Sequence, residues 1–228
     1  MCFRVYNLLS KEQAESMKQE LLKLEWTQGL AKTASLTEKV KNNSEILPTL
    51  QNASGAYSQM IQQELNNNVN LGVEILPTTI SVPKFNRYSS KGTYKWHYDA
   101  SPMGPIDMRT DYSCTLALTD SSEYEGGDLE IDINGHIIKA PRLEQGQCVV
   151  YESGQLHRVT PVTKGERISA ICWIRSLVKD PQQRQILTTL TRVLNECEDK
   201  QQPIESGSEA YTKLTGIQTI LSRMWLDA

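Results

Sequence analysis

The middle of the chain alternates apolar and polar residues at every second position, whereas both ends repeat apolar residues every three to four positions. The alternation starts near Ile80 and is clearest at Leu129, Ile131 and Ile133. A period of two is typical of strands that bury one face, and a period of 3.6 is typical of amphipathic helices. The pattern therefore predicts a β core with helical segments before and after it.

Turn residues separate the predicted strands. Asn134-Gly135 is the preferred pair for a tight hairpin turn. Further strands are predicted over Gln147–Tyr151 and Arg167–Arg175. Pro83 interrupts the first alternating run and predicts an edge or a bulge there. Many short strands in one chain favour a closed or two-sheet architecture. We expect a mainly β fold with α extensions, in which helices flank a double-stranded β-helix, or jelly roll.

The helical patterns set the expected boundaries. Ser10 and Gln13 form a capping box before an apolar repeat that continues to Leu24. A second repeat runs from Leu50 to Leu65. We expect three regions: an N-terminal helical support region (1–77), the β core (78–177) and a C-terminal helical region (178–228). Two apolar stripes in the last region predict packing on the sheet or a homo-oligomer.

Composition narrows the class of protein. The net charge is -3 and the pI is about 5.7, which disfavours a nucleic-acid partner because phosphate binding requires a basic face. The longest apolar run of the core, 168–174, is too short to span a membrane. The N-terminus lacks the features of a signal peptide. Five cysteines without a CxxC motif favour reduced thiols in the cytoplasm, with Cys148 and Cys172 buried.

Two of the three histidines occupy positions that suit metal binding. His97 and Asp99 form an HxD motif at the end of a predicted strand, where alternation places both side chains on one face. His157 lies at a predicted loop-to-strand boundary. Two imidazoles and one carboxylate are the ligand set of non-heme Fe(II) oxygenases, which leaves positions open for a keto acid and O2. We predict that these three residues are catalytic and bind Fe(II).

Arg167 lies ten residues after His157 and opens the strongest predicted strand. Its planar guanidinium suits the distal carboxylate of 2-oxoglutarate. Three other interpretations of the motif remain: a non-catalytic sensor that binds metal or metabolite, a zinc hydrolase, and a nucleic-acid demethylase. A complete triad with Arg167 argues against the first, zinc hydrolysis does not explain Arg167, and the third would require a basic groove.

Other polar residues have simpler explanations. His136 follows the hairpin turn and is expected to be exposed. Gly126-Gly127 is expected to form a turn or bulge, because no helix start follows it. Arg158 is expected to be a solvated loop arginine.

Several longer stretches carry a family resemblance. They are Val40-Lys-Asn-Asn43, Phe85-Asn-Arg-Tyr88, Tyr94-Lys-Trp-His97-Tyr-Asp99, Met108-Arg-Thr-Asp-Tyr-Ser113, Tyr124-Glu-Gly-Gly-Asp-Leu-Glu130, Leu156-His-Arg-Val-Thr-Pro-Val-Thr-Lys-Gly-Glu-Arg167, Trp173-Ile-Arg-Ser-Leu-Val178 and Leu221-Ser-Arg-Met-Trp225. Together they resemble the bacterial PKHD-type hydroxylases, which are prolyl/lysyl hydroxylase-like Fe(II)- and 2-oxoglutarate-dependent dioxygenases associated with iron uptake. The resemblance covers nearly the whole chain.

The resemblance implies a dioxygenase that hydroxylates an unactivated C–H while 2-oxoglutarate is decarboxylated to succinate. It implies Fe(II), 2-oxoglutarate, O2 and L-ascorbate (vitamin C) as cofactors and cosubstrates. It supports the triad and Arg167, and adds Tyr88 as a 2-oxoglutarate-binding residue. Tyr94 is either a pocket wall or a packing residue. The expected substrate is a prolyl or lysyl side chain of a protein or peptide, or a small molecule linked to iron acquisition. The segment 100–106 departs from the family pattern and is expected at the substrate entrance.

Overall fold

The computed structural model describes residues 3–29, 41–46, 53–100, 108–198 and 204–226. The chain divides into two compact units. The first consists of Met1–Leu65 and Ile80–Arg175, and the second of Asn66–Thr79 and Ser176–Ala228. The first unit contains the β core and the second is mainly helical. The three-part division at residues 77 and 177 stays a prediction.

The larger sheet of the core is antiparallel. Its strands follow the order β1 (Arg4–Asn7), β12 (Gln147–Glu152), β8 (Tyr112–Ala117), β15 (Arg167–Ser176), β6 (Lys84–Tyr88), β4 (Ser44–Ile46) and β2 (Thr27–Gln28). Strands that are distant in sequence are neighbours throughout, so the sheet is held together by long-range pairing.

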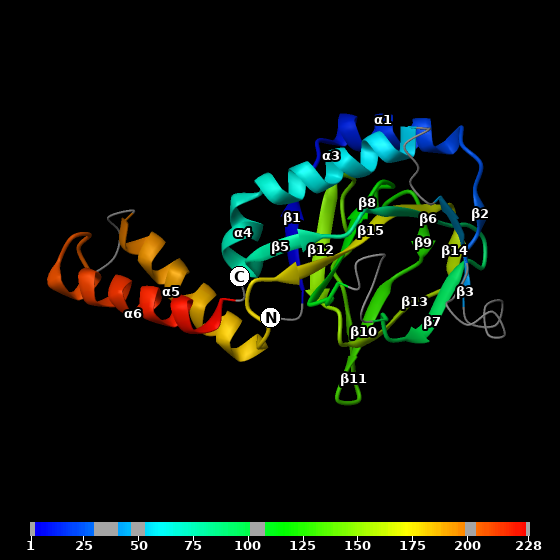
Figure 1. Ribbon diagram of the computed structural model, residues 1–228. Coiled ribbons are helices and arrows are strands. Elements are labelled where there is room, and N and C mark those ends of the chain that lie inside the picture. Colours follow the sequence, from blue (N-terminus) through cyan, green and yellow to red (C-terminus); the bar gives the residue numbers. More distant parts are fainter. Residues whose placement is uncertain (1–2, 30–40, 47–52, 101–107, 199–203, 227–228) are drawn as a thin grey trace. The chain divides into compact units, whose positions relative to one another are not determined.

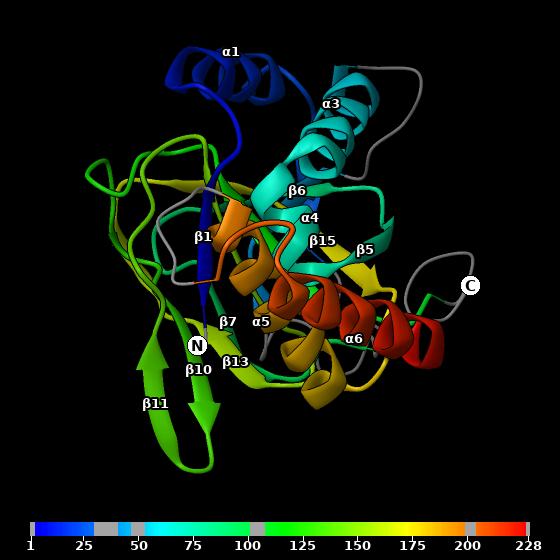
Figure 2. The ribbon, with the colours of Figure 1, turned by 90° about the vertical axis from the view of Figure 1, so that its left-hand side faces the viewer.

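The smaller sheet is also antiparallel. Its order is β11 (His136–Lys139), β10 (Leu129–Ile133), β13 (Leu156–Val159), β7 (Thr93–His97) and β3 (Lys41–Asn42). The hairpin β10–β11 extends from this sheet (Figure 2). A two-stranded ribbon pairs β14 (Val162–Lys164) with β9 (Glu125–Gly126). These two sheets, with helices outside the strands, confirm the predicted jelly roll with flanking helices.

The strand period explains which side chains enter the core. On β15, Arg167 lies opposite Tyr88 of β6, and Trp173 lies opposite Ser113 of β8. Because side chains directly opposite in an antiparallel pair point to the same face, each pair shares one face of the sheet. Residues two apart on β15 also share a face, so that face carries both pairs together with Ser169.

Helices α1 (Lys11–Leu22) and α3 (Ala53–Asn67) lie above the larger sheet in both ribbon views (Figures 1 and 2), with the smaller sheet on the opposite side. The predicted capping box is present at the start of α1, where the Ser10 and Gln13 side chains cap each other's backbone N–H groups. The predicted start of the second helix at Leu50 lies outside the described residues.

Pro83 lies between β5 (Pro77–Ile80) and β6, where the alternating run is interrupted. Proline cannot donate a ladder hydrogen bond, which accounts for this break. One local expectation is wrong. Arg158 is not a loop arginine. It lies on β13, where its guanidinium pairs with the Glu130 carboxylate at 2.7 Å and covers the Trp96 ring at 4.5 Å. Contacts with the Glu130 carboxylate on the neighbouring strand and with the Trp96 ring therefore fix the position of Arg158.

The second unit contains α4 (Val69–Ile75), α5 (Pro181–Glu198) and α6 (Glu209–Trp225). Gln218 of α6 donates to Thr191 of α5 at 2.7 Å, and the two helices pack side by side (Figure 2). Ile217, Ile220 and Met224 of α6 are exposed. None of the helices in the described part of the chain is long and apolar enough to cross a membrane.

Candidate active site

Two neighbouring strands of the smaller sheet place the two histidines side by side. His97 is the last residue of β7 and is paired in register with His157 of β13. A register shift beyond this pair turns Tyr94 to the same side as His97, and the two rings stack at 3.4 Å with 13° between their planes. Asp99 follows two residues after the end of β7. The strand pairing therefore brings together two residues that are 60 positions apart.

The three side chains converge on one point. One possible ligand atom from each of His97, Asp99 and His157 lies within 4.8 Å of the others. The His97 Nε2 atom is 3.8 Å from Asp99 Oδ1, and the His157 Nε2 atom is 3.7 Å from Asp99 Oδ2. His157 is 4% exposed, and the His97 and Asp99 side chains are 12% and 11% exposed. All three potential ligand side chains are thus polar and nearly buried.

Backbone carbonyls fix the orientation of both imidazoles. His97 Nδ1 lies 2.7 Å from the Lys95 carbonyl oxygen, and His157 Nδ1 lies 2.8 Å from the Gln155 carbonyl oxygen. A carbonyl only accepts, so each Nδ1 carries the proton and each Nε2 presents its lone pair to the centre. Burial, followed by the neighbouring His157, lowers the pKa of His97 to about 4. The ring is therefore neutral at physiological pH, the state required of a metal ligand.

The Asp99 carboxylate is held by partners that the sequence motif did not indicate. Its Oδ2 atom accepts a hydrogen bond from Ser113 Oγ at 2.7 Å and another from Trp173 Nε1 at 3.0 Å. Ser113 Oγ in turn lies 2.9 Å from Ser153 Oγ. Strand alternation puts Trp173 on the same face of β15 as Arg167. The sequence does not indicate that Trp173 contacts Asp99, because the two residues belong to separate segments of the chain.

A cavity connects the three residues with the predicted anchor residues. Its walls include Arg167, Tyr88 and Trp173 as well as the triad. The Arg167 guanidinium carbon lies 5.5 Å from the Tyr88 ring, and Arg167 Nη1 donates to Ser169 Oγ at 3.2 Å. Within the described residues this is the only protein hydrogen bond of the Arg167 side chain, so most of its N–H fork faces the cavity. Tyr88 is 4% exposed, and burial raises its pKa well above that of a free tyrosine.

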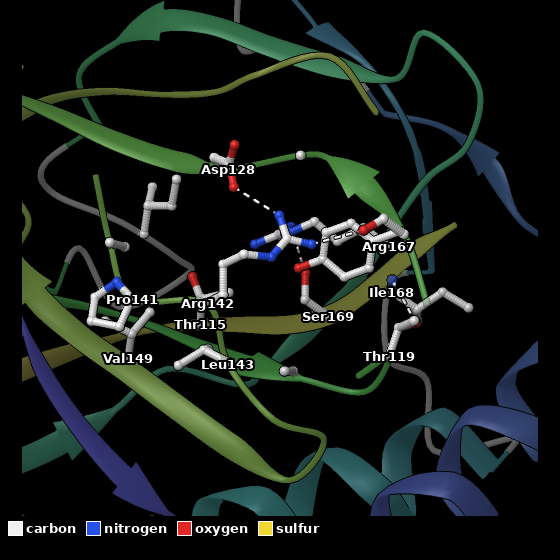
Figure 3. A pocket seen from close by; sticks show the side chains of 15 residues that line it. Thr115, Thr119, Asp128, Pro141, Arg142, Leu143, Val149, Arg167, Ile168 and Ser169 are labelled. Carbon is white, nitrogen blue, oxygen red and sulfur yellow. Dashed lines mark hydrogen bonds and ion pairs between the residues drawn. The ribbon is translucent and has the colours of Figure 1, made fainter. Parts of the chain in front are cut away.

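A second cavity, shown in Figure 3, lies beside the first and shares Thr115, Leu129, Arg167 and Ser169 with it. It contains none of the triad residues. Arg142 donates to the Asp128 carboxylate at 2.9 Å and to the carbonyl oxygens of Ser121 and Tyr124 at 2.6 and 2.8 Å. These bonds engage both terminal nitrogens of Arg142, whereas the Arg167 side chain makes a single protein hydrogen bond within the described residues, to Ser169.

Glycine packing shapes the anchor end. Gly127 has a φ of +64°, and a Cβ atom there would lie 2.9 Å from Val162 Cγ2 and 3.0 Å from Arg167 Cδ. Gly126, the last residue of β9, also has a positive φ, and Gly127 lies in the short segment between β9 and β10. His136 is exposed as expected, on the β10–β11 hairpin. The segment 101–107, which contains most of the predicted entrance, lies outside the described residues, as does Val40.

The donor set fits Fe(II). Two imidazole nitrogens and one carboxylate on one side of an ion are the arrangement of the non-heme iron oxygenases, and the partly free guanidinium fits the distal carboxylate of a keto acid. A zinc site with the same ligands would leave the Arg167 fork without a role.

Comparisons with known proteins agree with this chemistry. Residues 83–175 match the 2OG-Fe(II) oxygenase superfamily. A PKHD-type hydroxylase of Acidovorax ebreus is 34% identical over 99% of both chains. The PKHD-type hydroxylase YbiX of Escherichia coli is 31% identical over the full length of both. Among solved structures, a Trichoplax adhaerens prolyl hydroxylase in complex with a hypoxia inducible factor peptide fragment has a TM-score of 0.58 at 15% identity, covering 75% of this chain and 82% of that one. This last likeness shows the fold.

Proposed function

The chain belongs to the PKHD-type hydroxylases of the 2OG-Fe(II) oxygenase superfamily, and on that premise we propose that His97, Asp99 and His157 hold its iron while Arg167 binds 2-oxoglutarate. The protein is an enzyme, an iron- and 2-oxoglutarate-dependent hydroxylase. The observation that carries the residue assignment is the convergence of the three ligand atoms within 4.8 Å in the cavity that Arg167 also lines.

The triad residues are prepared for binding before any ligand arrives. The Lys95 and Gln155 carbonyls hold both imidazoles in the tautomer that presents Nε2. Ser113 and Trp173 fix the carboxylate through Oδ2. Fe(II) held by these residues would supply the chemistry by which O2 oxidises a substrate C–H to C–OH while 2-oxoglutarate is converted to succinate and CO2. Hydrogen-bond partners such as these two carbonyls, Ser113 and Trp173 set the orientation and basicity of ligands in metal sites generally.

Arg167 and Tyr88 form the cosubstrate end in this proposal. The guanidinium would bind the distal carboxylate of 2-oxoglutarate with two parallel N–H donors. Tyr88 supplies a ring beneath the guanidinium, and its raised pKa keeps the phenol protonated and able to donate. The cavity walls exclude bulk water from this ion pair, which strengthens it.

The substrate would approach near Tyr98, which lies between two of the ligand residues and is 64% exposed. We propose a prolyl or lysyl side chain of a protein or peptide as the substrate, with a small molecule linked to iron acquisition as the alternative. The peptide bound to the structurally similar Trichoplax prolyl hydroxylase supports the first class.

Three further assignments complete the proposal. L-ascorbate would serve as the reductant that keeps the iron ferrous, as the family resemblance implies. The buried free cysteines Cys114, Cys148, Cys172 and Cys197 are compatible with a reducing cytoplasm. The exposed apolar residues of α6 support a homo-oligomer formed through the terminal helices.

The test is spectroscopic. Adding Fe(II) and 2-oxoglutarate to the protein without oxygen should produce the weak visible charge-transfer band of the chelate. His157→Ala should abolish the band. Arg167→Ala should retain it only at far higher 2-oxoglutarate concentrations, because the distal carboxylate loses its bidentate partner. His136→Ala is the matched control, since His136 is exposed in a hairpin.

A folded, iron-loaded protein that shows no band would contradict the proposal and favour a non-catalytic metal sensor. A band of equal strength in His157→Ala would contradict the ligand assignment alone.

A further inference from the structure

A charged cluster, with two of its three members buried, lies behind the wall of the iron cavity. It consists of Lys41 of β3, Glu45 of β4 and Lys84 of β6. Lys41 is 3% exposed and Glu45 is 6% exposed. The Lys41 ammonium contacts Glu45 Oε1 directly, and Lys84 Nζ lies 3.6 Å from the same oxygen. Two cations thus share one carboxylate, and the cluster carries a net charge of +1.

Each ammonium group lies near an aromatic ring. Lys41 Nζ is 5.0 Å from the centre of the Tyr94 ring, and Lys84 Nζ is 5.4 Å from the centre of the Trp173 ring. Both distances fall within the range in which the negative face of a ring attracts a cation. Lys41 also pairs in register with Tyr94, because β3 and β7 are adjacent strands. The charges are therefore held against two rings that line the iron cavity.

Each of the two rings also contacts a side chain that is proposed to bind iron. Tyr94 stacks on the His97 imidazole, and Trp173 donates its indole N–H to Asp99 Oδ2. Two parallel connections result, Lys41 to Tyr94 to His97 and Lys84 to Trp173 to Asp99. Glu45 joins them at their outer ends.

Fold stability is a weak explanation for this cluster. Buried ion pairs are often no more stable than apolar side chains of the same volume, since desolvation offsets the attraction. Burial, and then the neighbouring Lys84, lowers the pKa of Lys41, whereas Glu45 raises it. Glu45 is also contacted by Asn43 Nδ2 at 3.5 Å. The Glu45 carboxylate thus offsets part of the cost of burying Lys41, and it lies between the two ammonium groups that contact the rings.

We propose that Lys41, Glu45 and Lys84 form a charged clamp that presses Tyr94 against His97 and orients Trp173 toward Asp99. The three are positioning residues, because none of them touches the ligand atoms. The inference rests on the proposed function, in which His97 and Asp99 bind iron. Loss of the clamp loosens one imidazole and one carboxylate and weakens metal binding.

The experiment uses Co(II), which substitutes for Fe(II) and reports its ligand geometry through its visible d–d spectrum. Lys84→Met removes the charge and keeps the length of a side chain that is 23% exposed, so the fold tolerates it better than a change at Lys41. We expect about tenfold weaker Co(II) binding, the lower end of the loss seen when outer partners of metal ligands are removed. The d–d bands should change shape, and Lys84→Arg should restore both readouts.

The matched control is Lys164→Met, which breaks a lysine–glutamate pair at the surface, with 3.2 Å between Lys164 Nζ and Glu125 Oε1. It should leave Co(II) binding and the spectrum unchanged. A folded Lys84→Met protein with unchanged Co(II) affinity and spectrum overturns the clamp, even if its melting temperature falls. Absence of any Co(II) spectrum in the unmodified protein overturns the metal site itself, which is the separate failure of the proposed function.

Discussion

The two ends of the iron cavity are built in different ways. At the metal end, Asp99 Oδ2 accepts two hydrogen bonds and each histidine is tied to a backbone carbonyl. At the anchor end, Arg167 makes one hydrogen bond to Ser169 and is otherwise placed by packing against Tyr88 and Gly127. One end is thus oriented by polar contacts and the other by shape.

The difference follows from the ligands proposed for the two ends, a metal ion at one and a carboxylate at the other. A metal ion needs fixed ligand positions, and partners that lock side chains before binding reduce the cost of assembling them. A carboxylate instead needs donors that are not already occupied, so its partner must be held without using its N–H groups. Substitutions at the metal end should therefore change metal affinity, and those at the anchor end should change 2-oxoglutarate affinity.

The largest effect is expected for Asp99→Asn. The amide keeps the size of the side chain but loses its charge and one acceptor. Because loss of an outer partner already costs about 10- to 100-fold in metal affinity, loss of a ligand should weaken Co(II) binding by more than about 100-fold. A Co(II) titration followed by visible absorption measures this. Binding within a few-fold of the unmodified protein would remove Asp99 from the ligand set.

An intermediate effect is expected for Gly127→Ala, at the anchor end. The new methyl group would lie about 3 Å from Arg167 Cδ and would displace the guanidinium. We expect roughly 30-fold weaker 2-oxoglutarate binding, which corresponds to about 2 kcal/mol, the value of one hydrogen bond to a charged group. Co(II) affinity should not change. Titration of the Fe(II) chelate band with 2-oxoglutarate gives the affinity.

Gly135→Ala is the control for backbone strain. Gly135 also has a positive φ, of +84°, but no atom lies within 4 Å of a Cβ placed there. Both variants should lose about 1–2 kcal/mol of unfolding free energy from the left-handed backbone conformation. Only Gly127→Ala should lose 2-oxoglutarate affinity, and an equal loss in both would attribute the effect to instability.

The smallest effect is expected for Ser113→Ala. Asp99 would lose one of its two hydrogen bonds and keep the one from Trp173. We expect about tenfold weaker Co(II) binding with unchanged 2-oxoglutarate affinity. Ser169→Ala, on the adjacent strand β15 and beside Arg167, should show the opposite pattern. If both serine variants changed both affinities alike, the two ends would not be independent.

Much of the fold was readable from local patterns. The capping box at Ser10 and Gln13 marked the start of α1, and the alternation at Leu129 to Ile133 with its Asn-Gly turn marked the β10–β11 hairpin. Both depend on interactions between residues close in sequence. Arg158 was misplaced in a loop because its partners, Glu130 and Trp96, belong to other strands. No local pattern indicates such a partner.

The sequence by itself indicated the candidate ligand residues, the strand that carries Arg167 and the family to which the chain belongs. The HxD spacing and the strand period act over a few residues, so they can be read without a fold. Only the tertiary structure decided that His157 lies in register with His97, that Ser113 and Trp173 hold Asp99, and that Lys41, Glu45 and Lys84 meet behind the cavity wall. These contacts join strands far apart in the chain, and strand pairing in the two sheets is what brings them together.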